Sequence, residues 1–233
     1  NRLLSSAISA YGEVGFVNKN DKNKQVNDEK PISNKNYKLI TKIEEIDELI
    51  NEIEEAGEFA VDTETSSLDP HQAELVGISI CAKIGKAFYI PLGHKSKNYF
   101  NKKEILKKFK PILEDTSVKK IGQNIKFDFI VFYHHGIHLN SIEDTMLMSY
   151  VLDAGKNRHN IDTLSEIHLG HKTISFKEIV GTGKKEINFS EVDVEKAKDY
   201  AAEDADVTYR LYKKFNKSLK AEKLVSIYEN FEK

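Results

Sequence analysis

Residues 59–65, which read Phe-Ala-Val-Asp-Thr-Glu-Thr, constrain the fold more than any other stretch of this chain. The apolar residues predict a short buried strand, and side chains along a strand point alternately to its two faces. Asp62 and Glu64 are therefore expected side by side on one face. Carboxylates are poor strand formers and are costly to bury without a compensating charge. A divalent cation is the expected compensation, because hard cations bind oxygen ligands.

The composition is that of a globular protein. Of the 233 residues, 39% are hydrophobic and 31% are charged. No apolar run approaches the ~20 residues that span a bilayer, so no membrane association is expected. The lone cysteine, Cys81, provides no disulfide framework and favours a reducing, cytoplasmic location. The formal net charge is -2, so any contact with nucleic acid must come from local patches. A monomer is the expected state.

Residues 1–36 and 37–233 are predicted to differ in structure. The first segment includes a polar run, 18–25, and cannot bury enough apolar surface to offset the entropy lost on ordering. It is therefore predicted to be a flexible linker, and the chain itself is expected to be a piece of a longer polypeptide. Residues 37–233 are predicted to form one α/β domain, a mixed five-stranded sheet flanked by helices. The predicted strands are 37–40, 59–65, 75–84, 86–92 and 118–122.

Hydrophobic periodicity and capping signals predict the helices. Asn124 is a candidate N-cap for the helix that follows the last strand. Ser141 and Asp144 form a capping pattern that predicts a helix starting at 141. The residues between 173 and 188 predict a looser, glycine-punctuated stretch. The predicted helices are 43–56, 101–114, 124–135, 141–152, 164–168, 192–215 and 224–231.

Two further acidic groups stand out. Asp128 lies in the first turn of a predicted helix, where an acidic residue could also simply favour the helix dipole. Tyr200 and Asp204 are four residues apart and share one face of a long helix. Asp204 lies near the apolar side of that helix, where an unpaired carboxylate would be costly. Solvent exposure is the expectation for three other acidic residues of this helix, Asp199, Glu203 and Asp206.

These residues together suggest a metal-dependent hydrolytic site. Asp62, Glu64, Asp128 and Asp204 supply enough hard oxygen to hold two Mg²⁺ or Mn²⁺ ions. Two such ions could activate a water molecule and stabilise both oxygens that exchange at a phosphodiester. The Tyr200 hydroxyl could hydrogen-bond the attacking water and orient it.

Three segments resemble the 3′–5′ proofreading exonuclease domain of bacterial DNA polymerase I: 61–68 (VDTETSSL), 121–128 (IGQNIKFD) and 200–208 (YAAEDADVT). Residues 144–147 and 172–176 are also similar to that family, which belongs to the DEDD exonuclease superfamily. The resemblance covers roughly residues 37–233. It implies a ribonuclease H-like fold and removal of nucleoside 5′-monophosphates, one at a time, from single-stranded or frayed 3′ ends of DNA. It also implies a covalently linked polymerase domain in the full-length protein.

The resemblance implies roles for the acidic residues. Asp62, Glu64 and Asp204 would bind the first metal ion, and Asp62 with Asp128 would position the second. Tyr200 would orient the nucleophilic water, which marks the tyrosine-type subgroup.

The resemblance also implies substrate contacts. Leu68 matches a residue that wedges against the terminal bases, and Phe176 matches an apolar contact to a frayed base. Stacking on a base tolerates any sequence, which suits an editing site. Phe127 departs from the tyrosine usual in the family, so one hydrogen bond to the substrate is expected to be missing. The implied contacts are Thr63, Leu68, Gln123, Asn124, Phe127, Arg158 and Phe176.

Two other functions fit the same pattern. An exonuclease that trims RNA 3′ ends, of the ribonuclease D kind, shares the carboxylates, although the residues around Phe176 favour the polymerase relative. A non-catalytic spacer domain of a polymerase is the third reading. The intact set of four carboxylates and a tyrosine argues against a spacer.

Overall fold

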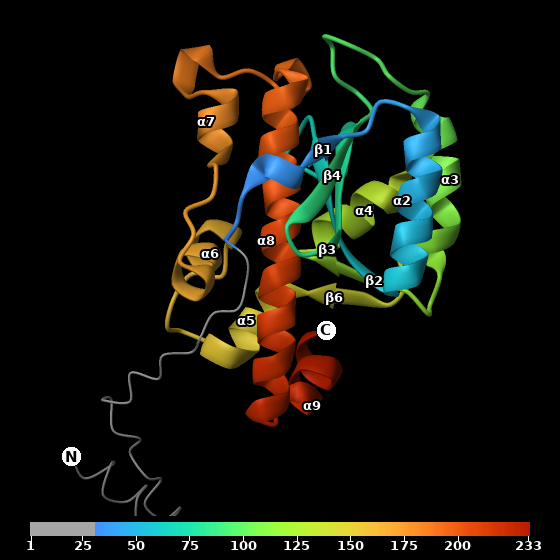
Figure 1. The fold of residues 1–233 in the computed structure, drawn as a ribbon. Helices are drawn as coiled ribbons and strands as arrows, with labels where there is room; N and C mark the ends of the chain where they lie inside the picture. The colour runs from blue at the N-terminus through green and yellow to red at the C-terminus, as the bar shows by residue number, and fades with distance from the viewer. Residues whose placement is uncertain (1–30) are drawn as a thin grey trace, which may run out of the picture. The chain divides into compact units, whose positions relative to one another are not determined.

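A six-stranded mixed sheet forms the centre of residues 31–233, the part of the chain that the computed structural model describes (Figure 1). The predicted linker over 1–36 lies for the most part outside the described residues, and Asn34–Asn36 form a short 3₁₀ helix. The strand order is β1-β4-β3-β2-β5-β6. The strands are β1 (Lys38–Leu39), β2 (Glu58–Thr65), β3 (Leu75–Lys83), β4 (Lys86–Pro91), β5 (Lys119–Gly122) and β6 (Ile142–Asp144).

The predicted mixed sheet is confirmed, but the predicted number of five strands was wrong. β2 pairs antiparallel with β3 and parallel with β5, and β6 adds a further parallel strand next to β5. β6 occupies the start of the predicted helix 141–152. Ser141 has a positive φ of 53°, which interrupts a helix, and Asp144 is the residue that caps the following helix. Asp144 was correctly recognised as part of the capping pattern, but the helix begins at Thr145, four residues later than predicted.

Helices cover both faces of the sheet (Figure 1). On one face, α2, α3 and α4 share an apolar core with β2. On the other face, the long helix α8 packs along β2, β3, β4 and β5, with α5 beside it and α6 on its outer side. No helix within residues 31–233 is long and apolar enough to span a membrane. The helices are α2 (Ile43–Ala56), α3 (Lys102–Glu114), α4 (Lys126–His134), α5 (Thr145–Asp153), α6 (Ile161–Leu169), α7 (Phe176–Val180), α8 (Val194–Ala221) and α9 (Val225–Ile227).

Strand β2 carries the expected alternation. Phe59 and Val61 belong to the core shared with α2, α3 and α4, whereas Ala60 belongs to the core on the α8 side. Because alternate residues of a strand share a face, Asp62 and Glu64 lie on the α8 side with Ala60. The tertiary fold therefore places both carboxylates of β2 toward the helix that carries Tyr200 and Asp204.

Helix α8 buries more charge than its sequence suggests. Glu203 and Asp206, which were predicted to face solvent, are buried, so that prediction was wrong. The Asp206 carboxylate accepts hydrogen bonds from the Tyr37 hydroxyl (2.9 Å), the Gly85 amide (2.8 Å) and Arg210 Nε (3.1 Å). These partners come mainly from distant segments, and helical periodicity alone cannot reveal them.

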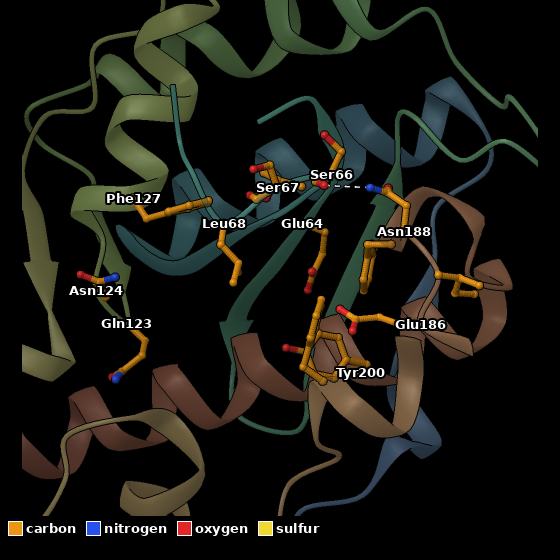
Figure 2. Close-up of a pocket in the computed structure, with 14 residues that line it drawn as sticks. Glu64, Ser66, Ser67, Leu68, Gln123, Asn124, Phe127, Glu186, Asn188 and Tyr200 are labelled. Atoms are coloured by element: carbon orange, nitrogen blue, oxygen red, sulfur yellow. Dashed lines mark hydrogen bonds between the residues drawn. The ribbon is translucent and has the colours of Figure 1, made fainter. Parts of the chain in front are cut away.

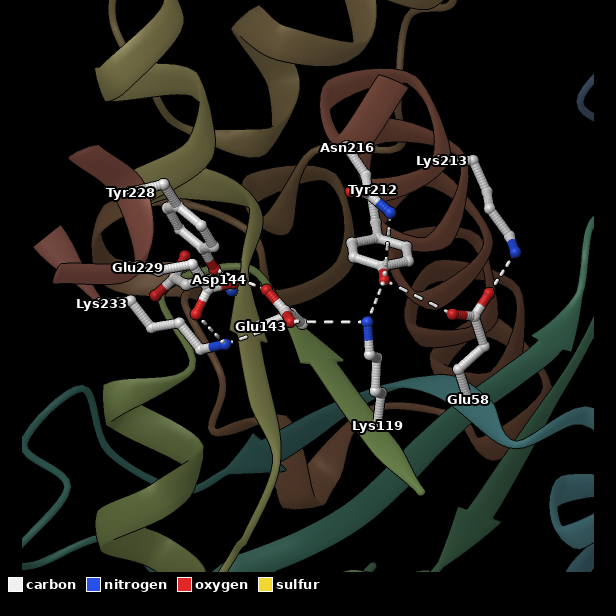
Figure 3. A network of polar contacts seen from close by, with 10 residues as sticks. All are labelled: Glu58, Lys119, Glu143, Asp144, Tyr212, Lys213, Asn216, Tyr228, Glu229 and Lys233. Carbon is white, nitrogen blue, oxygen red and sulfur yellow. Dashed lines mark hydrogen bonds and ion pairs between the residues drawn. The ribbon is translucent and has the colours of Figure 1, made fainter. Parts of the chain in front are cut away.

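The end of the described chain is fastened to the edge strand β6 (Figure 3). The Tyr228 hydroxyl donates to Glu143 (2.9 Å) and accepts from the Asp144 amide (2.9 Å). Lys233 forms an ion pair with Glu143 at 3.1 Å. The predicted helix 224–231 is α9 followed by a π-helical turn, Tyr228–Glu232. Tyr228 thus ties the last described residues to the edge strand of the sheet.

Gly77 is expected to be essential to the packing of β3. A Cβ atom there would lie 2.2 Å from the Tyr89 hydroxyl oxygen. Tyr89 is fully buried, and its hydroxyl is hydrogen-bonded to His94 at 2.7 Å, so the ring has little freedom to move. Gly77→Ala should therefore destabilise the fold by about 1–3 kcal/mol and lower the thermal midpoint by several degrees. Circular dichroism melts would measure this, and an unchanged midpoint would contradict the close approach.

Candidate active site

A pocket of about 720 Å³ opens at the carboxyl end of β2 (Figure 2). Its walls come from the loop after β2, the turn between β5 and α4, the segment around α7, and the start of α8. Leu68 and Phe127 lie on one side of Glu64, and Glu186 and Asn188 lie on the other (Figure 2). The pocket is lined by Glu64, Thr65, Ser66, Ser67, Leu68, Gln123, Asn124, Phe127, Phe176, Glu186, Ile187, Asn188, Phe189 and Tyr200.

The four predicted carboxylates converge behind this pocket from β2, α4 and α8. Glu64, Asp128 and Asp204 are only 6%, 2% and 7% exposed, and Asp62 is half-buried. Burial raises the pKa of Asp62 to about 6. Burial, and after it the charge of Asp62, also raises the pKa of each of the other three carboxyl groups. The fold therefore concentrates negative charge where water cannot fully solvate it.

Thr63 holds Asp128 in place. The Thr63 amide (2.8 Å) and hydroxyl (2.5 Å) both donate to Asp128 Oδ1. Thr63 was predicted to contact substrate, but its hydroxyl is used within the protein and the residue does not line the pocket. Asp128 lies in the first turn of α4, as predicted.

The donor set fits divalent cations. Glu64 Oε1 and Asp204 Oδ1 are buried oxygens without a hydrogen-bond partner among residues 31–233. Buried carboxylate oxygens without partners are costly, and Mg²⁺ or Mn²⁺ is the kind of ion that such oxygens bind. Within the described part of the chain, no group of three or more His, Cys, Asp and Glu side chains is arranged so that it could hold a metal ion. The fit rests on these unsatisfied oxygens and on the type of donor.

Tyr200 presents a protonated phenol to the pocket. It lies one helical turn before Asp204 on α8 and lines the pocket together with Glu64. Burial, followed by the charges of Asp204, Glu64 and Asp62, raises the pKa of Tyr200 well above its ordinary value. Its hydroxyl therefore remains a hydrogen-bond donor at neutral pH and above.

Two predicted substrate contacts are apolar and exposed. Leu68 is 88% exposed at the tip of the loop after β2, and Phe176 is 39% exposed at the start of α7. Exposed apolar side chains in a pocket wall can contact the apolar surface of a ligand. The Phe176 ring stacks on Phe189 with 6.2 Å between ring centroids.

The turn between β5 and α4 places two polar side chains, Gln123 and Asn124, in the pocket wall. Gln123 donates to the His159 carbonyl (2.7 Å) and accepts from the Thr145 hydroxyl (2.5 Å), so its amide braces the turn. Asn124 has a positive φ of 59° and an exposed side chain. The prediction of Asn124 as a helix cap was wrong, because Ile125 occupies that position.

Of the remaining predicted contacts, Phe127 lines the pocket and Arg158 does not. Arg158 is exposed on the segment between α5 and α6, next to His159. Sequence reasoning missed the wall formed by 186–189. Asn188 donates from its side-chain amide to the Ser66 carbonyl at 2.8 Å, which fixes the loop that carries Leu68 (Figure 2). The capping box of Asn188 and Glu191 was a sequence signal for order in this segment.

A mixed sheet with acidic side chains at the end of its central strand, Glu64 among them at the pocket, has the features expected of a nuclease. A family profile described as 3′–5′ exonuclease matches residues 37–220. The chain belongs to this family, the 3′–5′ exonuclease domain of DNA polymerase I.

Curated relatives are DNA polymerases I. The chain is 41% identical over 224 residues to DNA polymerase I of Rhizobium leguminosarum, covering 87% of this chain and 22% of that protein. It is 42% identical over 181 residues to the enzyme of Pseudomonas aeruginosa, covering 75% of this chain and 20% of that protein. The chain therefore spans about a fifth of the length of these relatives.

Solved structures share the fold. A protein titled "apo form of the nuclease" superposes with a TM-score of 0.63 at 19% identity, covering 82% of this chain and 83% of that one. Ribonuclease D of Escherichia coli gives 0.62 at 16% identity, covering 83% and 48%. Brucella melitensis NrnC with bound Mg²⁺ gives 0.58 at 23% identity, covering 84% and 82%.

The stability of the metal-free protein is expected to depend on pH and on divalent cations. Asp62 has a folded pKa raised from 3.8 to about 6, so the stability that its protonated form contributes is lost as pH rises through about 6. The pKa values of Glu64, Asp128 and Asp204 are shifted in the same direction. Adding Mg²⁺ or Mn²⁺ should therefore raise the thermal midpoint more at pH 8 than at pH 5. Melting curves with and without EDTA would measure this; an equal effect at both pH values would contradict it.

Proposed function

We propose that this chain hydrolyses phosphodiester bonds at the 3′ ends of DNA and releases nucleoside 5′-monophosphates. The proposal rests on four neighbouring carboxylates, three of them buried and Asp62 half-buried, beside a pocket with exposed apolar walls. Carboxylate oxygens can hold the ions that phosphodiester hydrolysis needs. Apolar walls can accept any base, which suits removal of mismatched nucleotides during proofreading.

Two divalent metal ions, Mg²⁺ or Mn²⁺, are the proposed cofactors. Asp62, Glu64 and Asp204 would hold one ion, and Asp62 with Asp128 would hold the other. When bound, such ions lower the pKa of a water molecule and stabilise the charge that develops on the phosphate. Asp128 is kept in place by its two hydrogen bonds from Thr63. These four carboxylates and Tyr200 are the proposed catalytic residues.

Tyr200 would orient the attacking water. Its phenol lines the pocket beside Glu64 and stays protonated, because burial and neighbouring carboxylates raise its pKa. A donor held at a fixed position can hydrogen-bond the water and direct its lone pair toward the phosphorus atom.

The proposed substrate is a single-stranded or frayed 3′ end. Leu68 would press against the terminal bases from one side, and Phe176 would contact a base from another. Asn124 would meet a phosphate or sugar, because the positive φ of the turn leaves its side chain exposed in the pocket. DNA is favoured over RNA because the relatives at 41% and 42% identity are DNA polymerases.

A covalently linked polymerase domain is the proposed partner. The chain spans 22% and 20% of two relatives that carry the name DNA polymerase I. We propose that the natural protein is correspondingly longer, acts as a monomer and works on DNA in the cytoplasm.

Digestion of a 5′-labelled single-stranded DNA oligonucleotide tests the function. With Mg²⁺ or Mn²⁺, the chain should produce a ladder that shortens from the 3′ end, and EDTA should abolish the ladder. The Asp62→Asn variant, prepared in the same way, controls for contaminating nucleases.

The alternatives predict different outcomes. Faster digestion of an RNA oligonucleotide of the same sequence would favour trimming of RNA 3′ ends. If the chain cuts neither substrate and calorimetry shows no binding of Mn²⁺, the carboxylates do not assemble a metal site and a spacer role is favoured. Binding of Mn²⁺ without cleavage would mean that the isolated chain lacks a domain that delivers the strand.

A further inference from the structure

Phe176 is held by a segment without regular structure. Residues 170–175 connect α6 to α7, and α7 has only five residues, too few to be stable by its own hydrogen bonds. The Phe176 ring nevertheless has a defined place. It lies parallel to the Phe189 ring, with an interplanar angle of 6°, and its centroid is 6.2 Å from that of Tyr200. Something outside α7 must fix this ring.

Glu203 ties this segment to α8. The side chain is 7% exposed, and both of its oxygens have partners in the segment. Oε1 is 2.9 Å from His171 Nε2, and Oε2 accepts a hydrogen bond from the Ile174 amide at 2.6 Å. The second bond is only two residues before Phe176, so it restricts the backbone from which the ring projects.

Two other side-chain hydrogen bonds of the segment 170–175 go to α6 and not to α8. The Ser165 hydroxyl donates to the His171 carbonyl at 2.8 Å, and the Thr173 hydroxyl donates to Asp162 at 2.7 Å. Both partners belong to α6. The bonds from Glu203 therefore link the segment to the helix that carries Tyr200 and Asp204.

We propose that Glu203 is a positioning residue that keeps Phe176 at a set distance from Tyr200 and Asp204. Its carboxylate lies one residue before Asp204 and three after Tyr200, so the group that places the base-contacting ring and the groups proposed to act on the phosphate share one rigid helix. The nature of the ligand rests on the proposed function; the ordering of Phe176 does not. Loosening the ring should weaken the hold on the terminal base, which raises KM by about tenfold and changes kcat much less.

A single-tryptophan reporter tests the ordering without any activity. The chain contains no tryptophan, so Phe176→Trp introduces one fluorophore at the position in question. Adding Glu203→Gln should lower its fluorescence anisotropy and increase its quenching by acrylamide. Asp206→Asn is the matched control, because Asp206 is a buried carboxylate on the same helix whose partners lie away from α7. It should leave both signals unchanged at temperatures below its melting transition. Unchanged signals in Glu203→Gln would overturn the proposal.

A kinetic cycle tests the consequence for the substrate. Glu203→Gln and Phe176→Ala should each raise KM for a single-stranded oligonucleotide about tenfold, and the double variant should do no worse than Phe176→Ala alone. If the increase in KM of the double variant equalled the product of the two single increases, the two residues would act independently and the proposal would be overturned. A Glu203→Gln variant that loses kcat and Mn²⁺ affinity would also overturn it. If the wild-type chain digests no oligonucleotide, the proposed function fails, and the reporter result still decides the role of Glu203.

Discussion

Replacing Asp62 with asparagine is expected to lower the rate of 3′-end digestion by on the order of 10³-fold. The charge of Asp62 raises the pKa of all three other carboxyl groups. Asp62 is also the residue proposed to contact both metal ions. An amide has nearly the same shape but carries no charge, so metal binding should weaken while the fold persists. Single-turnover digestion at saturating metal would measure the change. A rate within tenfold of wild type would contradict the proposed role.

The same substitution should stabilise the metal-free protein. At pH 8, Asp62 is ionised and lies among other carboxylates whose pKa values burial and its own charge raise. Removing that charge should raise the free energy of unfolding in EDTA by about 1–3 kcal/mol, and the gain should disappear below about pH 4, where the carboxyl group is protonated in both states. Urea titrations at both pH values would measure it. Glu104→Gln, at an exposed position of α3, is the control and should change little. If Asp62→Asn lowered the free energy of unfolding at pH 8, the charge of Asp62 would not destabilise the metal-free protein, which contradicts the prediction.

Asp206→Ala is expected to destabilise the fold by about 3–5 kcal/mol, which lowers the thermal midpoint by roughly 10 °C. The substitution removes the acceptor for the Tyr37 hydroxyl, the Gly85 amide and Arg210 Nε. Arg210 and Asp206 are 2% and 0% exposed, so the change leaves a buried cation without this counter-ion. Breaking one side of a buried pair is costly because the remaining charge stays desolvated.

Calorimetry would measure the effect of Asp206→Ala. Glu195→Ala is the matched control on the same helix, because Glu195 pairs with Lys198 at 2.9 Å on the exposed surface. It should cost less than about 1 kcal/mol. Equal effects of the two substitutions would mean that the buried pair contributes no more than a surface one. Below its melting transition, Asp206→Ala should retain exonuclease activity, since Asp206 lies outside the pocket.

Local patterns predicted most of the secondary structure. Alternation along β2 placed Asp62 and Glu64 on one face, and helical periodicity located α2 and α3 almost to the residue. Predictions failed where a strand or helix was too short to show a period. β6 has three residues, and it is a strand because Ile142 and Glu143 pair with Lys120 and Ile121 of β5. α7 has five residues and depends on contacts with α8.

The candidate site shows the same division. The sequence by itself singled out the carboxylates and the phenol of the candidate site, because metal-ligand chemistry depends on residue type and these residues stand out in apolar surroundings. Tertiary structure decided what the neighbouring polar groups do. The Thr63 hydroxyl donates a hydrogen bond to Asp128. The Gln123 side chain accepts one from Thr145, and the Glu203 side chain accepts one from the Ile174 amide, two residues before Phe176. Each of these bonds joins residues at least 20 positions apart, so only folding brings donor and acceptor together. A buried polar group must find a partner, and the identity of that partner is a property of the packed structure.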